Sequence, residues 1–476
     1  MNGGSVNGGR VKHSTARDHR TSVIVAALAS GFGVVLLLVT GALGQSLSED
    51  PFVRDSGSGS LLISIVAFVF LVIAVYVGAV VTTNTVATVI AGRTRTIALL
   101  RLIGSSARAQ RRAVAFEGLR SGILGSALGL VVGVGVAWLL VRLSIATGFA
   151  PEFRYDVVSP TIILPFAMVV LTTWGASWVG TRRVLDVTPL QAVSAAEEHR
   201  RENSASHNVR NTFAVILFVI GGLILALGVV VGMWTPLGVL VGLVGGILSF
   251  TGVVLGAELV MPPALRLVGR MFGRGPTASL ASANAVRYPE RSTRTTVGLV
   301  IAVTLVTTFV VTMETFRTLA LAAETESPDS YIGMQEALSI AIGVFSILIG
   351  FAAVIAAVGM INNLSLSVVQ RQRELGLLRA LGFTSSQVRR MIIVEAVQMS
   401  VAAVAVGLAL GIGYGWVGAQ SLLASFNGLP ELVPPTIPWG LVGVLALAAA
   451  ALALIASVAP SRRATRVSPV AALAQS

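Results

Sequence analysis

Residues 93–138 read RTRTIALLRLIGSSARAQRRAVAFEGLRSGILGSALGLVVGVGVAW, and residues 371–416 read RQRELGLLRALGFTSSQVRRMIIVEAVQMSVAAVAVGLALGIGYGW. A shift of 278 residues aligns the two stretches without a gap. Self-similarity of this kind indicates two copies of one structural unit. The residues of the first copy that have an identical mate in the second include Arg93, Arg95, Leu99, Leu100, Arg101, Gly104, Arg111, Arg112, Glu117, Gly129, Gly133, Gly135 and Trp138.

Long apolar segments surround both copies. The chain is 54% hydrophobic and 12% charged, whereas soluble domains carry about a quarter charged residues. Segments of about 20 apolar residues match the bilayer core, and they must be helical because lipid offers the backbone no hydrogen-bond partner. The sequence therefore predicts an all-α integral membrane protein with about ten transmembrane helices, at 22–44, 61–91, 119–141, 161–180, 212–232, 236–258, 296–318, 336–365, 397–417 and 439–459.

The duplication extends over four spans in each copy. Asn84 aligns with Asn362, and the pattern Arg-Arg-x-x-x-Val-x-Pro follows the last span of each copy, at 182–189 and 462–469. An even number of spans separates corresponding segments, so the two copies cross the membrane in the same direction. Parallel repeats of this kind are related by an axis along the membrane normal.

Basic residues are concentrated in alternate connections. Of the 34 Lys and Arg residues, 30 lie in the six segments 1–21, 92–120, 181–211, 263–295, 366–396 and 460–476. By the positive-inside rule these segments face the cytoplasm. We therefore expect a multi-pass protein of the cell membrane with both termini in the cytoplasm. The net charge of +13 is then a topology signal facing anionic lipid, and nucleic-acid binding is a poor explanation for it.

Spans and duplication together predict two parallel four-helix repeats joined by a two-helix linker. The expected order is a cytoplasmic N-terminal tail at 1–21, a first four-span repeat at 22–193, a cytoplasmic linker at 194–211, two linking spans at 212–262, a cytoplasmic interfacial segment at 263–295 and a second four-span repeat at 296–473.

Each copy of the duplicated segment reads as helix, glycine, helix cap and helix. We call this unit, at 93–117 and 371–395, an elbow. In the second elbow, Gly382 is placed to end the first helix in a left-handed C′ conformation. Thr384 and Gln387 then have the spacing of a capping box that starts the next helix.

The elbows offer apolar residues to another protein. Leu375, Leu378 and Leu381 are spaced by three residues, which predicts one apolar face. Because the Arg and Leu pattern itself is repeated, and not amphipathicity alone, we favour a docking element. The alternative is an interfacial helix that only anchors the bundle in the membrane.

The motifs resemble those of a known family. The pattern R-x-R-x-x-x-L-L-R-x-x-G, a glutamate at the head of the next span and the terminal Arg-Arg-x-x-x-Val-x-Pro are similar to the FtsX-like (MacB-type) permeases of ATP-binding cassette transporters, here duplicated in one chain. The resemblance implies a permease whose elbows dock on a separate ATPase and convert ATP hydrolysis into helix movement. Many members of that family carry a large extracytoplasmic domain, whereas the corresponding connections here, at about 45–60 and 319–335, are short.

The resemblance also implies partners. Two elbows in one chain imply two copies of an ATP-binding cassette ATPase, with ATP and Mg bound by that partner and no cofactor bound by this chain. Membrane lipids are a further expected partner, and an extracytoplasmic partner is an open option. The docking residues that we expect are Leu99, Leu100, Arg101, Gly104, Glu374, Leu377, Leu378, Arg379 and Gly382, and the expected coupling residues are Glu117 and Glu395.

The sequence lacks the residues of a nucleotide-hydrolysing or metal-dependent enzyme. A Walker A loop needs a lysine after glycine, and the single lysine, Lys12, follows valine. There are no cysteines, and the four histidines lie in segments expected in the cytoplasm. We therefore expect no catalytic, cofactor-binding or metal-binding residues, and we assign ATP hydrolysis to another chain.

Polar residues within the spans are candidates for function. Glu314 is an ionisable residue inside a span, although Arg317, one turn later, could neutralise it. Asn84 and Asn362 could join helices by hydrogen bonds or take part in gating. Glu117 and Glu395 start their spans, where a carboxylate suits the N-terminal end of a helix; coupling and charge pairing with nearby arginines both fit them.

Small and basic residues give two further expectations. The glycines at 129, 133, 135, 407, 411 and 413 permit close helix packing. Arg266, Arg270 and Arg274 are spaced by four, with Leu267 and Met271 between them, which predicts a basic interfacial helix against anionic lipid.

The sequence thus favours a permease subunit that couples ATP hydrolysis by a separate ATPase to export or membrane extraction of an amphiphile, such as a lipid, lipoprotein, peptide or hydrophobic drug. An alternative is a mechanical transmitter that regulates an extracytoplasmic enzyme. An ion-coupled secondary carrier is a third option, but it would require buried acidic or basic residues near the midplane, and the spans offer few.

Overall fold

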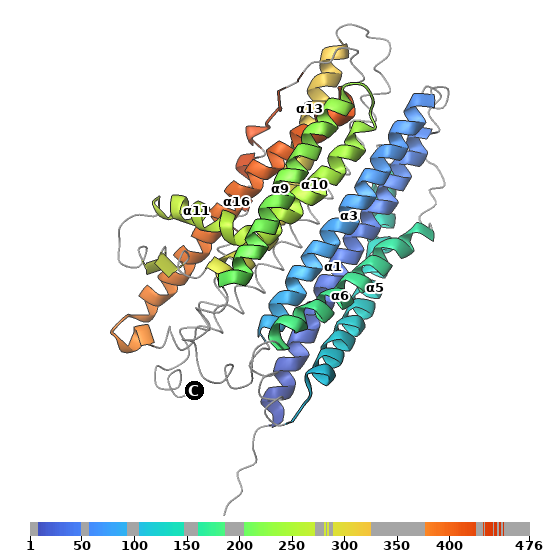
Figure 1. The fold of residues 1–476 in the computed structure, drawn as a ribbon. Coiled ribbons are helices and arrows are strands. Elements are labelled where there is room, and N and C mark those ends of the chain that lie inside the picture. Colours follow the sequence, from blue (N-terminus) through green and yellow to red (C-terminus); the bar gives the residue numbers. More distant parts are fainter. Residues whose placement is uncertain are drawn as a thin grey trace, which may run out of the picture. The chain divides into compact units, whose positions relative to one another are not determined.

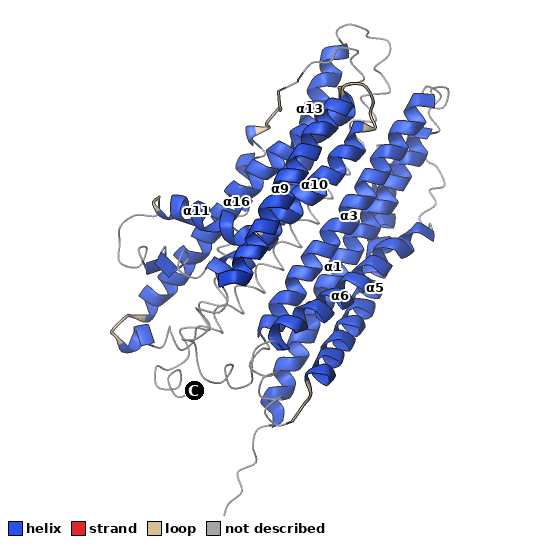
Figure 2. Ribbon diagram, viewed as in Figure 1, coloured by secondary structure: helices blue, strands red, loops and turns tan. Residues whose placement is uncertain are grey.

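The structure of the 476-residue chain is a computed structural model, and it describes residues 8–48, 57–92, 104–146, 160–185, 204–271, 289–324 and 377–424, with short pieces within 280–284 and 432–451. Within these ranges all regular secondary structure is helical (Figure 2). Seven of the described helices contain an apolar stretch of 18 residues or more, long enough to cross the bilayer core with little tilt. The chain is therefore an all-α integral membrane protein, as predicted.

The seven stretches correspond to seven of the ten predicted spans. They are Ser22–Val39, Ala107–Leu143, Pro160–Thr181, Asn208–Gly232, Gly238–Leu255, Thr296–Thr315 and Ser385–Leu422. The predicted span at 61–91 lies within α3 (Gly57–Gly92), whose apolar part is Leu71–Asn84. The predicted span at 336–365 and most of the one at 439–459 lie outside the described residues.

The chain divides into two compact units. Unit 1 comprises Met1–Ala42 and Phe70–Glu198, and unit 2 comprises Leu43–Val69 and His199–Ser476. The first repeat falls mainly in unit 1. The two linking spans belong to the same unit as the second repeat.

Unit 1 contains most of α1 (Gly8–Ser48) and α3, together with α5 (Ala107–Ala146), the short 3-10 helix η1 (Pro160–Ile162) and α6 (Ile163–Leu185) (Figure 1). Small residues let these helices approach closely. A Cβ on Gly78 of α3 would lie 3.7 Å from the carbonyl oxygen of Ala29 on α1. Buried Ala26 and Ala29 pack against Val169 of α6. Unit 1 is thus a helical bundle held together by close backbone contacts.

In unit 2, the linking spans form a helical hairpin of α9 (Ser204–Gly232) and α10 (Gly238–Leu255). Their backbones touch where glycines face each other: a Cβ on Gly228 would lie 2.6 Å from the amide nitrogen of Gly242. Such small-residue contacts stabilise helix pairs in lipid. Lipid tails are as apolar as the side chains, so burying apolar side chains between helices gives no hydrophobic stabilisation there. The two helices of the hairpin are therefore closely packed along their glycines.

The second repeat is represented in unit 2 by α13 (Pro289–Glu324) and α16 (Ser385–Leu423), which pack side by side. The helix α11 (Ala257–Gly269) follows α10 after a break at Gly256 and runs across α13 and α16 (Figure 1). Buried residues of all three helices form one core, which includes Met261, Leu265, Val268, Leu299, Val303, Met399 and Ala403.

The repeat glycines pack in the same manner in both halves, against the first span of their own repeat. The prediction of close packing is confirmed for Gly129 and Gly133 on α5, which lie against α1, and for Gly407 and Gly411 on α16, which lie against α13. At Gly135 and Gly413, in contrast, a Cβ would meet no atom of the described residues within 4 Å, so the structure shows no close packing there. Two residues further along a helix the side chain points to nearly the opposite side.

Candidate functional site

The second elbow ends its first helix with a Schellman motif. Gly382 has a φ of +98°, a left-handed conformation that glycine adopts without strain. The amide of Gly382 donates to the carbonyl of Arg379 at 3.1 Å, and the amide of Phe383 donates to the carbonyl of Leu378 at 3.1 Å. These are the two hydrogen bonds of the motif. The prediction that Gly382 occupies the C′ position is confirmed.

A capping box then starts α16. The Oγ1 of Thr384 accepts a hydrogen bond from the amide of Gln387 at 3.3 Å, and the amide of Thr384 donates to Oε1 of Gln387 at 2.9 Å. From this cap α16 runs without interruption into the ninth predicted span. A force applied to the elbow therefore acts directly on the end of a transmembrane helix.

The first elbow has the same geometry in the part that the structure describes. Gly104 has a φ of +102°. Ser106 stands where the second copy has Thr384, and its Oγ accepts a hydrogen bond from the amide of Ala109 at 3.2 Å. The helix α5 begins at Ala107 and α16 at Ser385, which are mates in the alignment of the two copies. The duplication of sequence is thus also a duplication of backbone geometry.

Leu378 and Leu381 of the second elbow do not share the single face that the spacing of the three leucines predicts, and Leu375 lies outside the described residues. Leu378 is half-buried and packs on a cluster formed by Ala281, Val388, Met391 and Ile392, because the Schellman motif brings it against Phe383. By contrast, the side chains of Leu377 and Leu381 are 52% and 72% exposed. The apolar surface that the described part of this elbow offers to a partner therefore consists of Leu377 and Leu381.

The first elbow is tied to the fourth span of its repeat by a contact that the sequence did not predict. The guanidinium carbon of Arg111 on α5 lies 3.9 Å from the ring centroid of Trp178 on α6, a cation–π geometry. The ring of Trp174 lies 6.4 Å from that of Trp178. The first elbow thus contacts α6 and is continuous with α5. The alignment singled out Arg111, but no spacing pattern points to its partner on another helix.

Glu117 and Glu395 lie at equivalent places, ten residues after the first residue of α5 and of α16. The sequence-based reason for a carboxylate there was the positive end of the helix, and this reason is wrong. Each helix begins in the elbow, about three turns before its span, whereas the helix dipole acts within the first turn. Glu395 is buried and Glu117 is half-buried. Each half thus has one carboxylate where elbow helix becomes span.

The remaining predicted site residues are spread over the chain. Asn84 on α3 and Glu314 on α13 are half-buried, and Arg317 is exposed. The carbonyl of Glu314 accepts a hydrogen bond from Oγ1 of Thr318 at 3.0 Å. The predicted residues that lie outside the described part of the chain are Leu99, Leu100, Arg101, Arg274, Asn362, Glu374 and Leu375.

Polar contacts hold α11 in place. Arg210 on α9 forms an ion pair with Glu258 on α11, and Nε2 of Gln398 on α16 donates to the carbonyl of Leu265 at 2.9 Å. These partners are at least 48 residues apart in the sequence, so local patterns could not reveal them. These two contacts connect α11 to the start of α9 and to the part of α16 where the elbow becomes the span.

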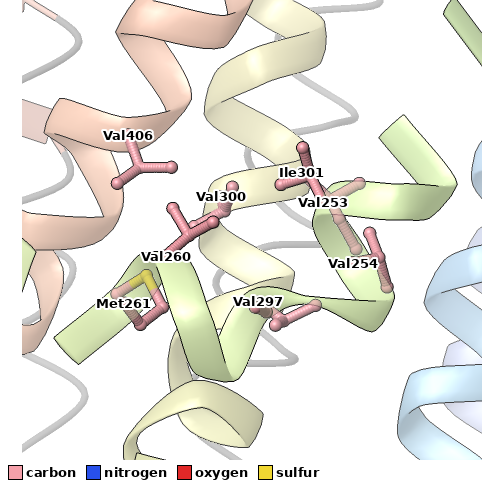
Figure 3. Close-up of a pocket in the computed structure, with 9 residues that line it drawn as sticks. Val253, Val254, Val260, Met261, Val297, Val300, Ile301 and Val406 are labelled. Atoms are coloured by element: carbon pink, nitrogen blue, oxygen red, sulfur yellow. The ribbon is translucent and has the colours of Figure 1, made fainter. Parts of the chain in front are cut away.

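An apolar pocket lies where α10 breaks into α11 (Figure 3). Its walls are formed by Val253 and Val254 of α10, Ala257, Val260 and Met261 of α11, Val297, Val300 and Ile301 of α13, and Val406 of α16. The cavity volume is about 10 Å³, no more than one water molecule needs. It is too small to hold a transported molecule. Among the described residues, moreover, no three His, Asp or Glu side chains are grouped so that they could hold a metal ion.

The repeats match the model of the FtsX-like permease C-terminal family, over residues 68–189 and 346–469. The two regions make up just over half of the chain. The chain belongs to the FtsX-like permease family. Each matched region contains one elbow and ends at the proline of the Arg-Arg-x-x-x-Val-x-Pro motif, so the family match confirms both the resemblance and the duplication.

Curated relatives are similar over part of their length. The uncharacterized ABC transporter permease YknZ of Bacillus subtilis is 27% identical over 141 residues, which are 30% of this chain and 33% of that protein. The macrolide export ATP-binding/permease protein MacB of Hyphomonas neptunium is 33% identical over 135 residues, 27% of this chain and 19% of that protein. The lipoprotein-releasing system transmembrane protein LolE of Haemophilus influenzae is 26% identical over 130 residues, 25% of this chain and 31% of that protein. The matched stretch thus spans about a third of YknZ and of LolE, and less of MacB.

Proposed function

We propose that this FtsX-like permease is the membrane subunit of an ATP-binding cassette system and that its two elbows dock on two copies of a separate ATPase. The observation that carries the proposal is the repeated geometry of a glycine turn and a hydroxyl cap at the start of a helix that continues into a span. Such a helix is a rigid lever between a cytoplasmic partner and the bilayer. The relatives named as ABC transporter permeases and export proteins support the same function.

The transported molecule that we propose is an amphiphile, such as a lipid, lipoprotein, peptide or hydrophobic drug. Glycine-mediated contacts close the described helix pairs tightly, and the apolar pocket has room for no solute. These features favour a substrate that moves along the lipid-facing surface of the bundle over a polar solute that crosses it through a pore. The names of MacB and LolE, which refer to macrolide export and lipoprotein release, point in the same direction.

The first prediction concerns the source of energy. Because the sequence contains no Walker A lysine, the purified chain is expected to hydrolyse no ATP above the background of a mock preparation. Adding the proposed partner, an ATP-binding cassette ATPase that co-purifies with the chain, is expected to give hydrolysis that depends on both proteins. A higher rate of ATP hydrolysis on addition of amphiphiles would support export. A rate that amphiphiles do not change would favour the mechanical transmitter. Hydrolysis by the pure chain alone would refute the proposal.

A second prediction concerns orientation. The chain lacks cysteine, so single cysteines can be labelled without background. Cysteines introduced at Ser58, Ala150 and Ser327 are expected to react with an impermeant reagent in intact cells, because 30 of the 34 basic residues lie in the other connections. Cysteines at Ser206 and Ser476 are expected to react only after the cells are opened. Strong labelling at Ser206 in intact cells would reverse the proposed topology.

A further inference from the structure

The exposed face of α11 is divided into two strips. Leu267 of α11 and Met271, in the turn directly after the C-cap residue Arg270, are 67% and 77% exposed, and Val260 is exposed on the same side. Arg266 and Arg270, spaced by four residues, are exposed beside them. Residues four apart lie one above the other on a helix. An apolar strip therefore runs alongside a basic one.

The opposite face of α11 is firmly buried. Met261, Leu265 and Val268 belong to the core shared with α13 and α16, and the contacts of Glu258 and of the Leu265 carbonyl fix the helix further. The exposed leucine and methionine are therefore not residues of a loosely attached helix that could turn inward. They are held outward.

The contacts of α11 place it at one level of the bundle. It touches α9 through Arg210, close to the first residues of that helix, and α13 through Thr293, whose Oγ1 donates to the carbonyl of Ala257 at 3.5 Å. Both contacts are at the N-terminal ends of helices that lead into apolar spans. This is the level at which the hydrocarbon core meets the headgroups.

We propose that this face of α11 binds anionic phospholipid of the cytoplasmic leaflet. The strip of Val260, Leu267 and Met271 enters the acyl-chain boundary, and Arg266 and Arg270 bind the phosphate and acidic headgroup. Fixed arginines beside exposed apolar residues match the two halves of a lipid, and a helix with this division lies in the membrane interface. The proposal goes beyond coupling to an ATPase, and it holds whether or not an ATPase docks on the elbows.

Fluorescence tests the position of the apolar strip. The variant Leu267→Cys, in this otherwise cysteine-free chain, is labelled with bimane and placed in nanodiscs of phosphatidylglycerol and phosphatidylcholine. Phosphatidylglycerol with brominated acyl chains is expected to quench the label strongly. The matched control is Leu381→Cys, on an equally exposed leucine of the elbow, whose label is expected to stay unquenched. An unquenched label at position 267 would overturn the proposal. A label at position 267 that is shielded from water only when a protein partner is added would overturn it as well.

Lipid selectivity tests the basic strip. Wild-type protein extracted from equimolar phosphatidylglycerol and phosphatidylcholine is expected to retain phosphatidylglycerol with a preference of about 25-fold, since each of the two arginines near the surface contributes roughly fivefold. Arg266→Gln with Arg270→Gln is expected to abolish that preference. The control Arg142→Gln with Arg317→Gln removes the same charge from two exposed arginines near the C-terminal ends of α5 and α13 and is expected to keep it. Equal retention by both double variants would contradict the proposal.

Discussion

The variant Gly129→Ala is expected to lower the free energy of unfolding by about 3 kcal/mol, although it adds only one methyl group. That methyl would fall on the backbone carbonyl of Ala27 and lie 2.8 Å from the amide nitrogen of Gly31. Both atoms belong to the backbone of α1, so no side-chain rotation can relieve the clash. The two helices would have to separate, and the contacts along their interface would loosen.

The second repeat offers the same test with its own control. A Cβ on Gly411 would lie 2.8 Å from the carbonyl oxygen of Thr304, whereas one on Gly413, two residues later, would meet no atom of the described part of the chain within 4 Å. Gly411→Ala is therefore expected to destabilise the protein. Gly135→Ala and Gly413→Ala are expected to be neutral or to stabilise it by about 0.5–1 kcal/mol, because alanine favours a helix over glycine.

Thermal unfolding of the four variants in detergent, followed by the loss of monodisperse protein on size exclusion, measures these effects. Gly129→Ala and Gly411→Ala are expected to have melting temperatures well below those of Gly135→Ala and Gly413→Ala. Equal melting temperatures for all four would mean that the close helix contacts are not those of the folded protein.

Features that depend on a few neighbouring residues could be predicted from the sequence. The predictions of a left-handed turn at Gly382 and of a capping box at Thr384 and Gln387 are correct. A left-handed turn and a helix cap each require particular residues at fixed local spacing. The apolar spans were predictable for a similar reason, since the length of an apolar run is set by bilayer thickness.

Features that depend on contacts between helices could not be predicted. The spacing of Leu375, Leu378 and Leu381 suggested one docking face, but the turn at Gly382 brings Leu378 against its own chain. The stacking of Arg111 on Trp178 and the ion pair of Arg210 with Glu258 join residues on different helices. Helical periodicity carries no information about which helix lies opposite.

A second large effect is expected at the elbows. Leu377→Asp with Leu381→Asp places two charges on the exposed apolar surface of the second elbow. In a docked complex these charges would be desolvated without a partner, at a cost of about 2–5 kcal/mol, which corresponds to a loss of affinity of roughly 30-fold or more at that elbow. The corresponding positions of the first elbow are Leu99 and Ile103. Changing all four positions to Asp is expected to remove docking on both sides.

Two controls separate docking from folding. Leu377→Met with Leu381→Met keeps the surface apolar and is expected to preserve the complex. Leu378→Asp, in contrast, introduces a charge among Ala281, Val388 and Met391 and is expected to reduce the amount of permease in the membrane. If Leu378→Asp left abundance intact and released the ATPase instead, Leu378 would be a docking residue after all.

The number of ATPase subunits that co-purify with each permease chain directly measures docking at the two elbows. The co-expressed ATP-binding cassette ATPase should be recovered at two copies per wild-type chain, at about one copy with the Leu377→Asp and Leu381→Asp variant, and at none with the variant changed at four positions, while membrane abundance stays the same. A four-position variant that is present at normal abundance and retains the full complement of ATPase would contradict the account.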